Sequence, residues 1–445
     1  MPNNVFLRIL EPIEGQFEPK TLDKTGMELE VLLLDKDGIP TPQADEIING
    51  IGKAEGYHQE ISLASVETVT EPHNNIFETA LDLMKRAKRL DEIAKGAGLL
   101  TLPLDTSLIP YEHERRHDSD VAGLITKTIG LDGLEIKTKV NGTHIHFSQE
   151  EGKVIDQMNY LTASDPVTIL LTSASPIEGF HNWRIHNYRN IAHRKLPYQG
   201  QMQDLKRSLE EHEAEVKAEF KKFKQRAVEN GHIFTELDYY DEYCSISGPV
   251  RLSPKHSTVE ARTAGSNPYL YNLIAYLTLL EGGMRRIRSG DVKGVTNPLL
   301  ESVLMKDDLK GDSKKLKRLH DDAARYGLNN TENNEYCISF LEFAHKGLED
   351  REKAFVDRFI GMTYDGETAA DYIKEAADSR TVNHNIHRAI YEDVYVPQRE
   401  FMLRALTHLT KERKDKQRSE LPEYVRRKTQ EQGSLAGLRE ELVFA

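Results

Sequence analysis

Two glutamates spaced two residues apart are the side chains in this sequence best suited to hold a metal ion. Glu28 and Glu30 belong to residues 26–35, a largely apolar run that reads GMELEVLLLD. We predict that this run is a β-strand, in which residues two apart project to the same face. Two carboxylates on one face repel each other and resist burial unless a cation lies between them, usually an oxygen-seeking ion such as Mg²⁺. The simpler alternative is a half-exposed strand whose glutamates are hydrated.

Two histidines show the same spacing further along the chain. His144 and His146 occur in residues 140–148, which read VNGTHIHFS and are also typical of a strand. Imidazole is a frequent metal ligand and a good partner for phosphate. An isolated histidine is more often a structural residue, whereas a pair on one strand face leaves a structural role and a ligand role equally open.

Two further strands carry charged residues that require an explanation. Glu260 and Arg262 are two apart in residues 257–264, which read STVEARTA. They are therefore neighbours on one face, and the alternative to a functional role is a structural ion pair along the strand. Glu67 lies within residues 61–70, a run rich in β-branched residues that we predict to be a strand.

A locally basic segment stands out in an otherwise acidic protein. Residues 181–195 read HNWRIHNYRNIAHRK and contain Arg184, Arg189 and the only tryptophan of the chain. Arginine binds phosphate and carboxylate groups through two parallel hydrogen bonds, so this segment could hold an anionic substrate. The alternative is a solvated charged surface.

These residues must be positioned by a framework of strands and helices. Helical spacing of apolar residues and capping signals predict helices at 74–95, 203–230 and 267–288. Asp165–Pro166 has the form of an N-cap followed by proline, and predicts a helix that begins there and ends near Ser173.

The remaining stretches carry weaker signals. We expect residues 105–135 to be irregular. The chain from 300 onward is charged and helical in pattern, and residues 411–428 are expected to form a solvated helix without chemistry. These signals predict a catalytic domain at residues 1–295 and a mostly helical region at 296–445.

Composition narrows the classes of function. Acidic residues outnumber basic ones by 72 to 59, so the net charge of −13 argues against nucleic-acid binding driven by bulk charge. Two cysteines cannot form a disulfide framework. No apolar run reaches the length of a membrane span, and the first residues lack a signal-peptide pattern. We therefore expect a cytoplasmic protein without a membrane or nucleic-acid partner.

The four strands share one form, because each presents polar groups on one face. Together they could line the open face of an antiparallel sheet, where carboxylates and a histidine hold hard cations and arginines meet a transferable phosphate. The common glycine-rich nucleotide motifs are absent from the sequence. The combination is typical of an ATP-dependent enzyme without a P-loop.

The ordered motifs resemble those of glutamate–cysteine ligases and related carboxylate–amine ligases, within the glutamine synthetase-like superfamily. They cover roughly residues 20–290 and read GMELE, SVETVT, GTHIHFS, SASP, NYR and TVEAR. The resemblance implies an α+β fold in which a curved antiparallel sheet forms a funnel with helices on its outer side. It also implies ATP as a substrate, more than one Mg²⁺, an acyl phosphate formed on a carboxylate such as the γ-carboxyl of glutamate, and an amide product.

Site roles follow from the resemblance, residue by residue. Arg262 would stabilise the transferring phosphoryl group, with Glu67 also counted among the catalytic residues. Arg184 and Arg189 would hold phosphate or the substrate carboxylate. His146 would lie beside the ATP, and Glu60 would supply a further metal ligand. The implied Mg²⁺ ligands are Glu28, Glu30, Glu67, Glu260 and His144, the last of which could instead contact phosphate.

Several alternatives stay open at this point. The sequence does not identify the amine acceptor. A specialised γ-glutamyl or amino-acid ligase is the next hypothesis after a glutamate–cysteine ligase. A guanidino-type kinase would form a phosphorylated product without an amide. A catalytically silent relative would bind a nucleotide or metabolite as a sensor. Homo-oligomerisation through the helical C-terminal region is also left open.

Overall fold

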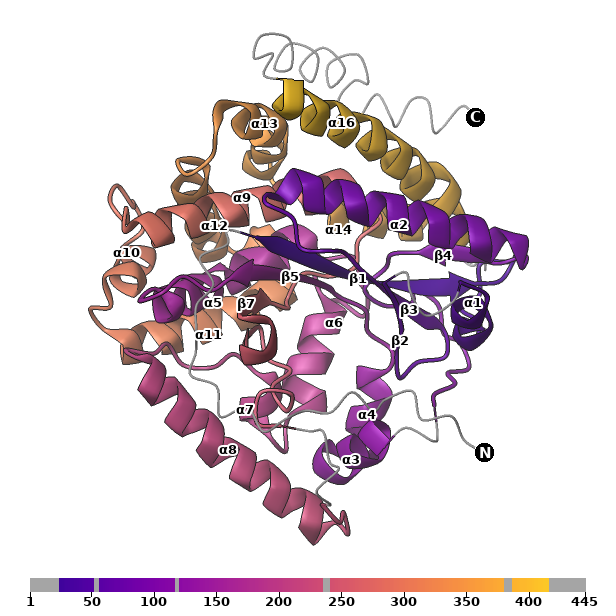
Figure 1. Cartoon of the computed structure of the whole chain (residues 1–445), viewed down its shortest axis with the longest axis horizontal. Helices are drawn as coiled ribbons and strands as arrows, with labels where there is room; N and C mark the ends of the chain where they lie inside the picture. Colours follow the sequence, from indigo (N-terminus) through magenta and orange to yellow (C-terminus); the bar gives the residue numbers. More distant parts are fainter. Residues whose placement is uncertain (1–23, 52–55, 117–119, 235–240, 380–385, 416–445) are drawn as a thin grey trace.

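An antiparallel sheet of seven strands runs through the part of the chain that the computed structural model describes, which is residues 24–51, 56–116, 120–234, 241–379 and 386–415 (Figure 1). The strands pair in the order β2-β3-β1-β5-β7-β6, and β4 pairs with β1. Every one of these pairs is antiparallel. The strands are β1 (Thr25–Leu34), β2 (Tyr57–Gln59), β3 (Ser65–Val69), β4 (Leu100–Leu102), β5 (Thr143–Ser148), β6 (Val250–Ser253) and β7 (Thr258–Ala261).

The central strand β1 has one apolar face and one polar face. Met27, Leu29 and Val31 are buried, whereas the alternate residues Glu28 and Glu30 are only partly buried. This alternation is the strand periodicity that the sequence predicts. The apolar face packs into the core, and the polar face is left to line a site.

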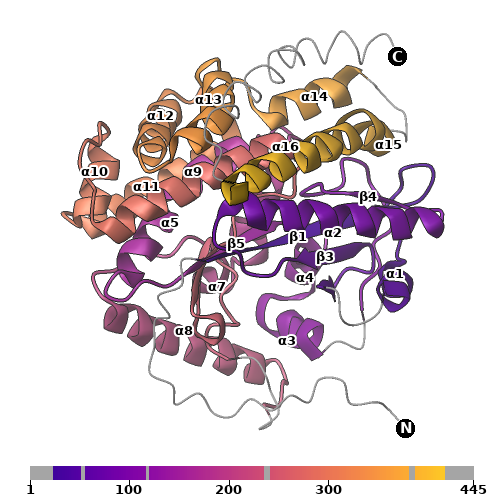
Figure 2. The ribbon, with the colours of Figure 1, turned by 45° about the horizontal axis from the view of Figure 1, so that its top comes forward.

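Helices cover the apolar face of the sheet. The helices α2 (Ile76–Gly96) and α5 (Val154–Thr172) contact its strands, and α9 (Leu270–Ser289) packs against both of them. Figure 2 shows α2 lying across the sheet, with α16 (Val396–Asp415) alongside it. The predicted fold class is therefore confirmed: α+β, with an antiparallel sheet, flanking helices and a helical C-terminal region.

A second, smaller helical group has its own hydrophobic cluster. It is formed by α3 (Asp120–Ile129), α4 (Leu131–Lys137), the π-helix η1 (His186–Ala192) and α8 (Leu209–Glu229). Figure 1 shows α3, α4 and α8 on the side of the sheet away from α2. The prediction that residues 105–135 are irregular is therefore wrong for α3 and most of α4, whose apolar residues are buried against η1 and α8 rather than against the sheet.

The C-terminal part of the chain is helical where it is described. Its helices share one hydrophobic cluster with the sheet, which contains both Leu29 of β1 and Phe340 of α12 (Thr331–His345). The predicted division at residue 295 stays a prediction, and residues 416–428 of the predicted tail helix lie outside the described residues. The other helices are α1 (Ala44–Ile51), α6 (Trp183–Ile185), α7 (Pro197–Gly200), η2 (Pro254–His256), α10 (Pro298–Met305), α11 (Leu309–Tyr326), η3 (Gly327–Asn329), α12 (Thr331–His345), α13 (Asp350–Tyr364), α14 (Ala369–Ser379), α15 (Ile386–Ile390) and η4 (Tyr391–Tyr395).

The Asp165–Pro166 pair does not begin a helix, which corrects the sequence prediction. Both residues lie inside α5, which begins at Val154. The Asp165 side chain is buried and accepts a hydrogen bond from the Thr263 hydroxyl, and its other oxygen contacts a ring nitrogen of His320. Burial of α5 on all sides and these tertiary partners override the local capping signal.

None of the described helices combines the length and the apolar character that crossing a lipid bilayer requires.

Asp91 joins α2 to the C-terminal helices, and its removal tests how far this contact stabilises the fold. The buried carboxylate accepts hydrogen bonds from the Tyr391 hydroxyl at 2.6 Å and from Arg399 Nη1 at 2.8 Å. We expect Asp91→Ala to lower the free energy of unfolding by about 3–5 kcal/mol, because Arg399 keeps a buried charge without its partner. Chemical denaturation measures this loss.

Lys95→Ala is the matched control, since the Lys95 side chain is 47% exposed beside the same carboxylate, and we expect this substitution to lower the free energy of unfolding by less than about 1 kcal/mol. Equal losses in the two variants would contradict the prediction.

Candidate active site

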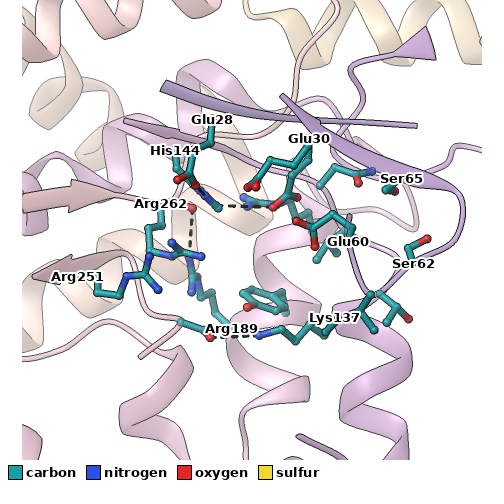
Figure 3. Close-up of a pocket in the computed structure, with 18 residues that line it drawn as sticks. Glu28, Glu30, Glu60, Ser62, Ser65, Lys137, His144, Arg189, Arg251 and Arg262 are labelled. Carbon is teal, nitrogen blue, oxygen red and sulfur yellow. Dashed lines mark hydrogen bonds and ion pairs between the residues drawn. The ribbon is translucent and has the colours of Figure 1, made fainter. Parts of the chain in front are cut away.

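The polar face of the sheet lines a cavity of about 350 Å³. Figure 3 shows Glu60 facing Lys137 and Arg189 across this space. The acidic side chains come from β1, β3 and the segment before β3, and the basic ones come from α4, α6, η1 and the β6–β7 pair. The ionisable residues that line the acidic and basic sides of the cavity are Glu28, Glu30, Glu60, Glu67, His144, Lys137, Arg184, Arg189, Arg251 and Arg262.

Three carboxylates crowd together on the sheet side of the cavity. Glu67 on β3 lies directly opposite Glu30 on β1 in the strand register. Oxygen atoms of Glu30, Glu60 and Glu67 all lie within 4.8 Å of one another. Burial and then the Glu60 charge raise the pKa of Glu30 to about 8. Burial and then the neighbouring glutamates raise the pKa of Glu67 well above its usual value, and burial likewise raises that of Glu60. Ionisation of all three groups together would therefore need additional positive charge close to them.

Glu28 has a different environment, because two histidines contact it. Its Oε2 lies 2.7 Å from His144 Nδ1, and its Oε1 lies 3.0 Å from His146 Nε2. Burial opposes ionisation of Glu28, but the hydrogen bonds to His144 and His146 outweigh it and lower the pKa of the carboxyl. Burial and then the charge of Arg262 lower the pKa of His144 to about 4. Burial opposes protonation of His146 too, but Glu260 and Glu28 raise its pKa.

Glu260 forms ion pairs with Arg262 and Arg251, and its predicted role as a metal ligand stays a prediction. Its fully buried carboxylate accepts hydrogen bonds from Arg262 and, at 2.6 Å, from Arg251 Nε. Burial opposes ionisation, but Arg262 and Arg251 outweigh it and lower the pKa of Glu260 to about 2. Neither Glu260 nor His146 lines the cavity wall itself. Both instead lie behind Glu28 and the arginines.

The donor atoms fit hard divalent cations. Carboxylate oxygens are the ligands that Mg²⁺ prefers, whereas imidazole suits softer ions such as Zn²⁺. The group that contains only carboxylates therefore fits Mg²⁺ best, and the repulsion within it is what a bound cation would relieve. The three groups of ligand atoms close enough to share an ion are Glu30, Glu60 and Glu67; Glu28, Glu67 and His144; and Glu28, His146 and Glu260.

The arginines on the opposite wall are held by backbone carbonyl groups. Arg189 Nη1 donates to the Gly200 carbonyl at 3.0 Å, and Arg184 Nη1 donates to the Thr263 carbonyl at 2.8 Å. Both side chains are buried. Burial lowers the pKa of Arg189 to about 10, so the guanidinium stays charged at neutral pH. These fixed cations are suited to hold an anionic group in the cavity.

The structure brings the predicted residues together, and it adds several that the sequence analysis did not single out. Lys137 ends α4, two residues beyond the segment 105–135 that was expected to be irregular. Tyr188 lies in the NYR motif but was given no role, and Arg251 lies opposite Glu260 on a strand that was not predicted. Ser247 contacts Lys137, whose Nζ donates to its hydroxyl at 3.3 Å. The position of Arg251 beside Glu260 follows from the pairing of β6 with β7, which spacing along the sequence does not report.

Comparison with known proteins identifies the family. The sequence profile of glutamate–cysteine ligase family 2 (GCS2) matches residues 24–292. This match covers more than half of the chain, and the chain belongs to glutamate–cysteine ligase family 2. The predicted class of enzyme, an ATP-dependent carbon–nitrogen ligase, is confirmed by this membership.

Individual relatives are distant. A Rhodococcus jostii (strain RHA1) protein named "Putative glutamate--cysteine ligase 2-1" is 24% identical over 298 residues, which are 64% of this chain and 73% of that protein. A bifunctional glutathione synthetase from Pasteurella multocida superposes with a TM-score of 0.57 at 13% identity, over 84% of this chain and 52% of that one. This chain thus spans about half the length of the bifunctional protein. A glutamate–cysteine ligase from Francisella tularensis, solved in complex with AMP, has a TM-score of 0.54 at 12% identity, over 92% of this chain and 98% of its own. These solved structures share the fold.

Removing one of the crowded carboxylates tests the electrostatics of the cavity. A folded state that holds protons on Glu30 and Glu67 loses stability as pH rises from the usual carboxyl pKa of 4.5 through about 8, because the unfolded chain releases those protons more readily. We expect Glu67→Gln to raise the melting temperature of the metal-free protein at about pH 8, and less so at about pH 5.5. Added Mg²⁺ or Mn²⁺ should stabilise the unaltered protein more than the variant. Calorimetry measures all of these shifts.

The matched control for this prediction is Glu71→Gln, whose carboxylate lies just beyond β3 with its side chain 76% exposed. We expect its melting temperature and its response to the metal to equal those of the unaltered protein. If Glu67→Gln melts lower than the unaltered protein at both pH values and still responds fully to the metal, the crowding argument is wrong.

Proposed function

We propose that this protein joins a carboxylate to an amine in an ATP-dependent reaction through an acyl phosphate, with the γ-carboxyl of glutamate as the substrate carboxylate. The observation that carries the proposal is the cavity itself, in which a cluster of carboxylates faces a wall of fixed arginines. Membership of glutamate–cysteine ligase family 2 supports the choice of carboxylate. The polar walls suit a triphosphate and a charged amino acid far better than an apolar ligand.

Metal ions have a defined place in this proposal. Glu30, Glu60 and Glu67 would hold one Mg²⁺, and Glu28 with His144 would contribute to a second ion together with Glu67. Bound Mg²⁺ would neutralise phosphate charge and align the terminal phosphate of ATP for transfer. We assign Glu260 the role of positioning Arg262 rather than that of a metal ligand, because its carboxylate already accepts hydrogen bonds from two guanidinium groups.

The arginines would act on the phosphate and the substrate. A carboxylate is a poor nucleophile and a worse electrophile, so it must be held in line with the phosphorus atom that it attacks. Arg262 is fixed by Glu260 and projects into the cavity, where its charge would offset the charge that develops on the transferring phosphoryl group. Arg189 and Arg184 are anchored at backbone carbonyls, and they would orient the substrate carboxylate.

An assay of ADP release across pairs of amino acids, followed by mass spectrometry of the product, tests this function. An amide product with ADP and phosphate supports a ligase. A phosphorylated product without an amide indicates a guanidino-type kinase, and the absence of ADP release with every pair indicates a protein that only binds its ligands. Each of the last two results overturns the proposal.

Arg262 provides the sharpest test of the assigned roles. We expect Arg262→Ala to lower kcat by about 10²–10³-fold, because one preorganised donor to the transition state is lost, while Arg251 keeps Glu260 paired and the fold intact. Glu28→Gln, which alters a proposed metal ligand, should abolish ligation. Steady-state kinetics measures the loss of activity, and circular dichroism shows whether each variant keeps its fold. Arg194→Ala is the matched control, because Arg194 belongs to the same basic segment but pairs with Asp132 at the exposed surface, and we expect full activity. Near-normal turnover in Arg262→Ala would show that this role is misassigned.

A further inference from the structure

Tyr188 is a buried phenol on the cation-rich wall of the cavity, and the proposed function leaves it without a role. It lies on the π-helix η1, directly before Arg189. Its side chain is only 7% exposed, and the residue lines the same cavity as the crowded carboxylates. Its hydroxyl is within hydrogen-bonding reach of the Ser247 side chain. A short π-helix often marks a functional site, because it changes which side chains share a face.

Positive charges surround this phenol from several elements. The Arg189 guanidinium carbon lies 5.0 Å from the centre of the Tyr188 ring, and Lys137 Nζ of α4 lies 5.8 Å from it. Figure 3 shows Lys137 and Arg189 on the same side of the cavity. Arg262, beyond the end of β7, and Arg184 of α6 also interact with Tyr188 electrostatically.

The neighbouring His193 does not cancel these positive charges. The His193 ring packs edge-on against Tyr188, with ring centres 5.1 Å apart. Burial, and then Lys137 and Arg189, lower the pKa of His193 well below its usual value, so its imidazole is neutral. Burial alone would raise the pKa of Tyr188, but Lys137, Arg189 and Arg262 outweigh it and lower the pKa to about 8. The phenolate form is therefore accessible close to neutral pH.

The second half of the proposed reaction requires a proton acceptor. An amine substrate is an ammonium ion at neutral pH, and it has no free electron pair until it loses a proton. The carboxylates on the sheet side serve the metal ions in the proposed function, and Glu28 and Glu260 are already held by histidines and arginines. His144 is a weak acceptor with a pKa lowered to about 4. Among the described residues on the cation-rich wall, Tyr188 has the right chemistry.

We propose that Tyr188 is a catalytic residue that accepts the proton from the incoming amine, an assignment that rests on the proposed ligase function. The phenolate oxygen takes one proton from the ammonium group and frees the nitrogen electron pair. The nitrogen attacks the carbonyl carbon of the acyl phosphate, and the carbon–nitrogen bond forms. The carbon–oxygen bond to phosphate breaks, phosphate leaves with the electron pair, and the excess proton on nitrogen passes to the departing phosphate.

Tyr188→Phe tests this assignment, because it removes the hydroxyl and keeps the ring that Arg189 and Lys137 contact. The rate of product formation is measured for the variant and for the unaltered protein in the presence of ATP, Mg²⁺ and glutamate. The acceptor is either cysteine or hydroxylamine. Hydroxylamine is already neutral at neutral pH and needs no proton acceptor. We expect the rate with cysteine to fall by about 10²-fold or more, and the rate with hydroxylamine to stay within about twofold of that of the unaltered protein.

The outcomes separate this proposal from the one on which it rests. An unaltered protein that releases no ADP with glutamate and either acceptor overturns both proposals. If the unaltered protein is active and Tyr188→Phe retains full activity with cysteine, the proton-acceptor role is wrong. If Tyr188→Phe loses the same factor with both acceptors, Tyr188 has a merely structural role and the assignment is again overturned.

Two further variants sharpen the test. Tyr198→Phe is the matched control: it removes a buried hydroxyl that has no hydrogen-bond partner among the described residues and does not line the cavity. We expect it to keep full activity with both acceptors. Lys137→Met removes a cation that lowers the pKa of Tyr188, so the rise of the cysteine rate with pH should move to higher pH relative to the hydroxylamine rate. An unmoved pH profile would contradict the proposal.

Discussion

The register between antiparallel strands decides where charge lies in this protein. Glu30 lies opposite Glu67, Glu28 lies opposite His144, and His146 lies opposite Glu260. Because side chains alternate along a strand, a slip of one residue would turn these groups into the hydrophobic core beneath α2 and α5. The cost of burying an unpaired carboxylate in that core is large. The apolar half of each strand therefore enforces the geometry of the polar half.

The cavity has carboxylates crowded on one wall and arginines gathered on the opposite wall. Glu30, Glu60 and Glu67 are crowded enough that burial and mutual repulsion keep their pKa values raised. Arg184 and Arg189 opposite are buried and held by backbone carbonyl groups, and the charges of Arg184 and Arg262 lower the pKa of Glu30 without outweighing its burial. Such an arrangement is relieved when cations occupy the acidic side and an anion occupies the basic side. A metal-bound nucleotide has this pattern of charge, and no glycine-rich phosphate loop is required to bind it.

The sequence predicted the sheet side of the site far better than the opposite side. Strand spacing is a local property, so the common orientation of Glu28 with Glu30 and of His144 with His146 could be read from adjacent residues. Lys137 and Tyr188 lie on helical segments that pack into one hydrophobic cluster with α3 and α8, and no local sequence pattern predicts those contacts. The opposite error occurred at Asp165–Pro166, where a strong local signal was overridden by burial. Tertiary contacts therefore account for both the missing residues and the misplaced helix.

One buried contact extends the site into the C-terminal part of the chain. Asp165 of α5 links His320 of α11 to Thr263, the residue that follows Arg262. The helices beyond residue 300 thus share in holding the backbone beside the cavity, although none of their described residues lines it. A homologue that kept every cavity residue but lost this contact would present the same groups at altered spacing. Conservation of the cavity residues is for that reason an incomplete criterion when active members of such a family are sorted from inactive ones.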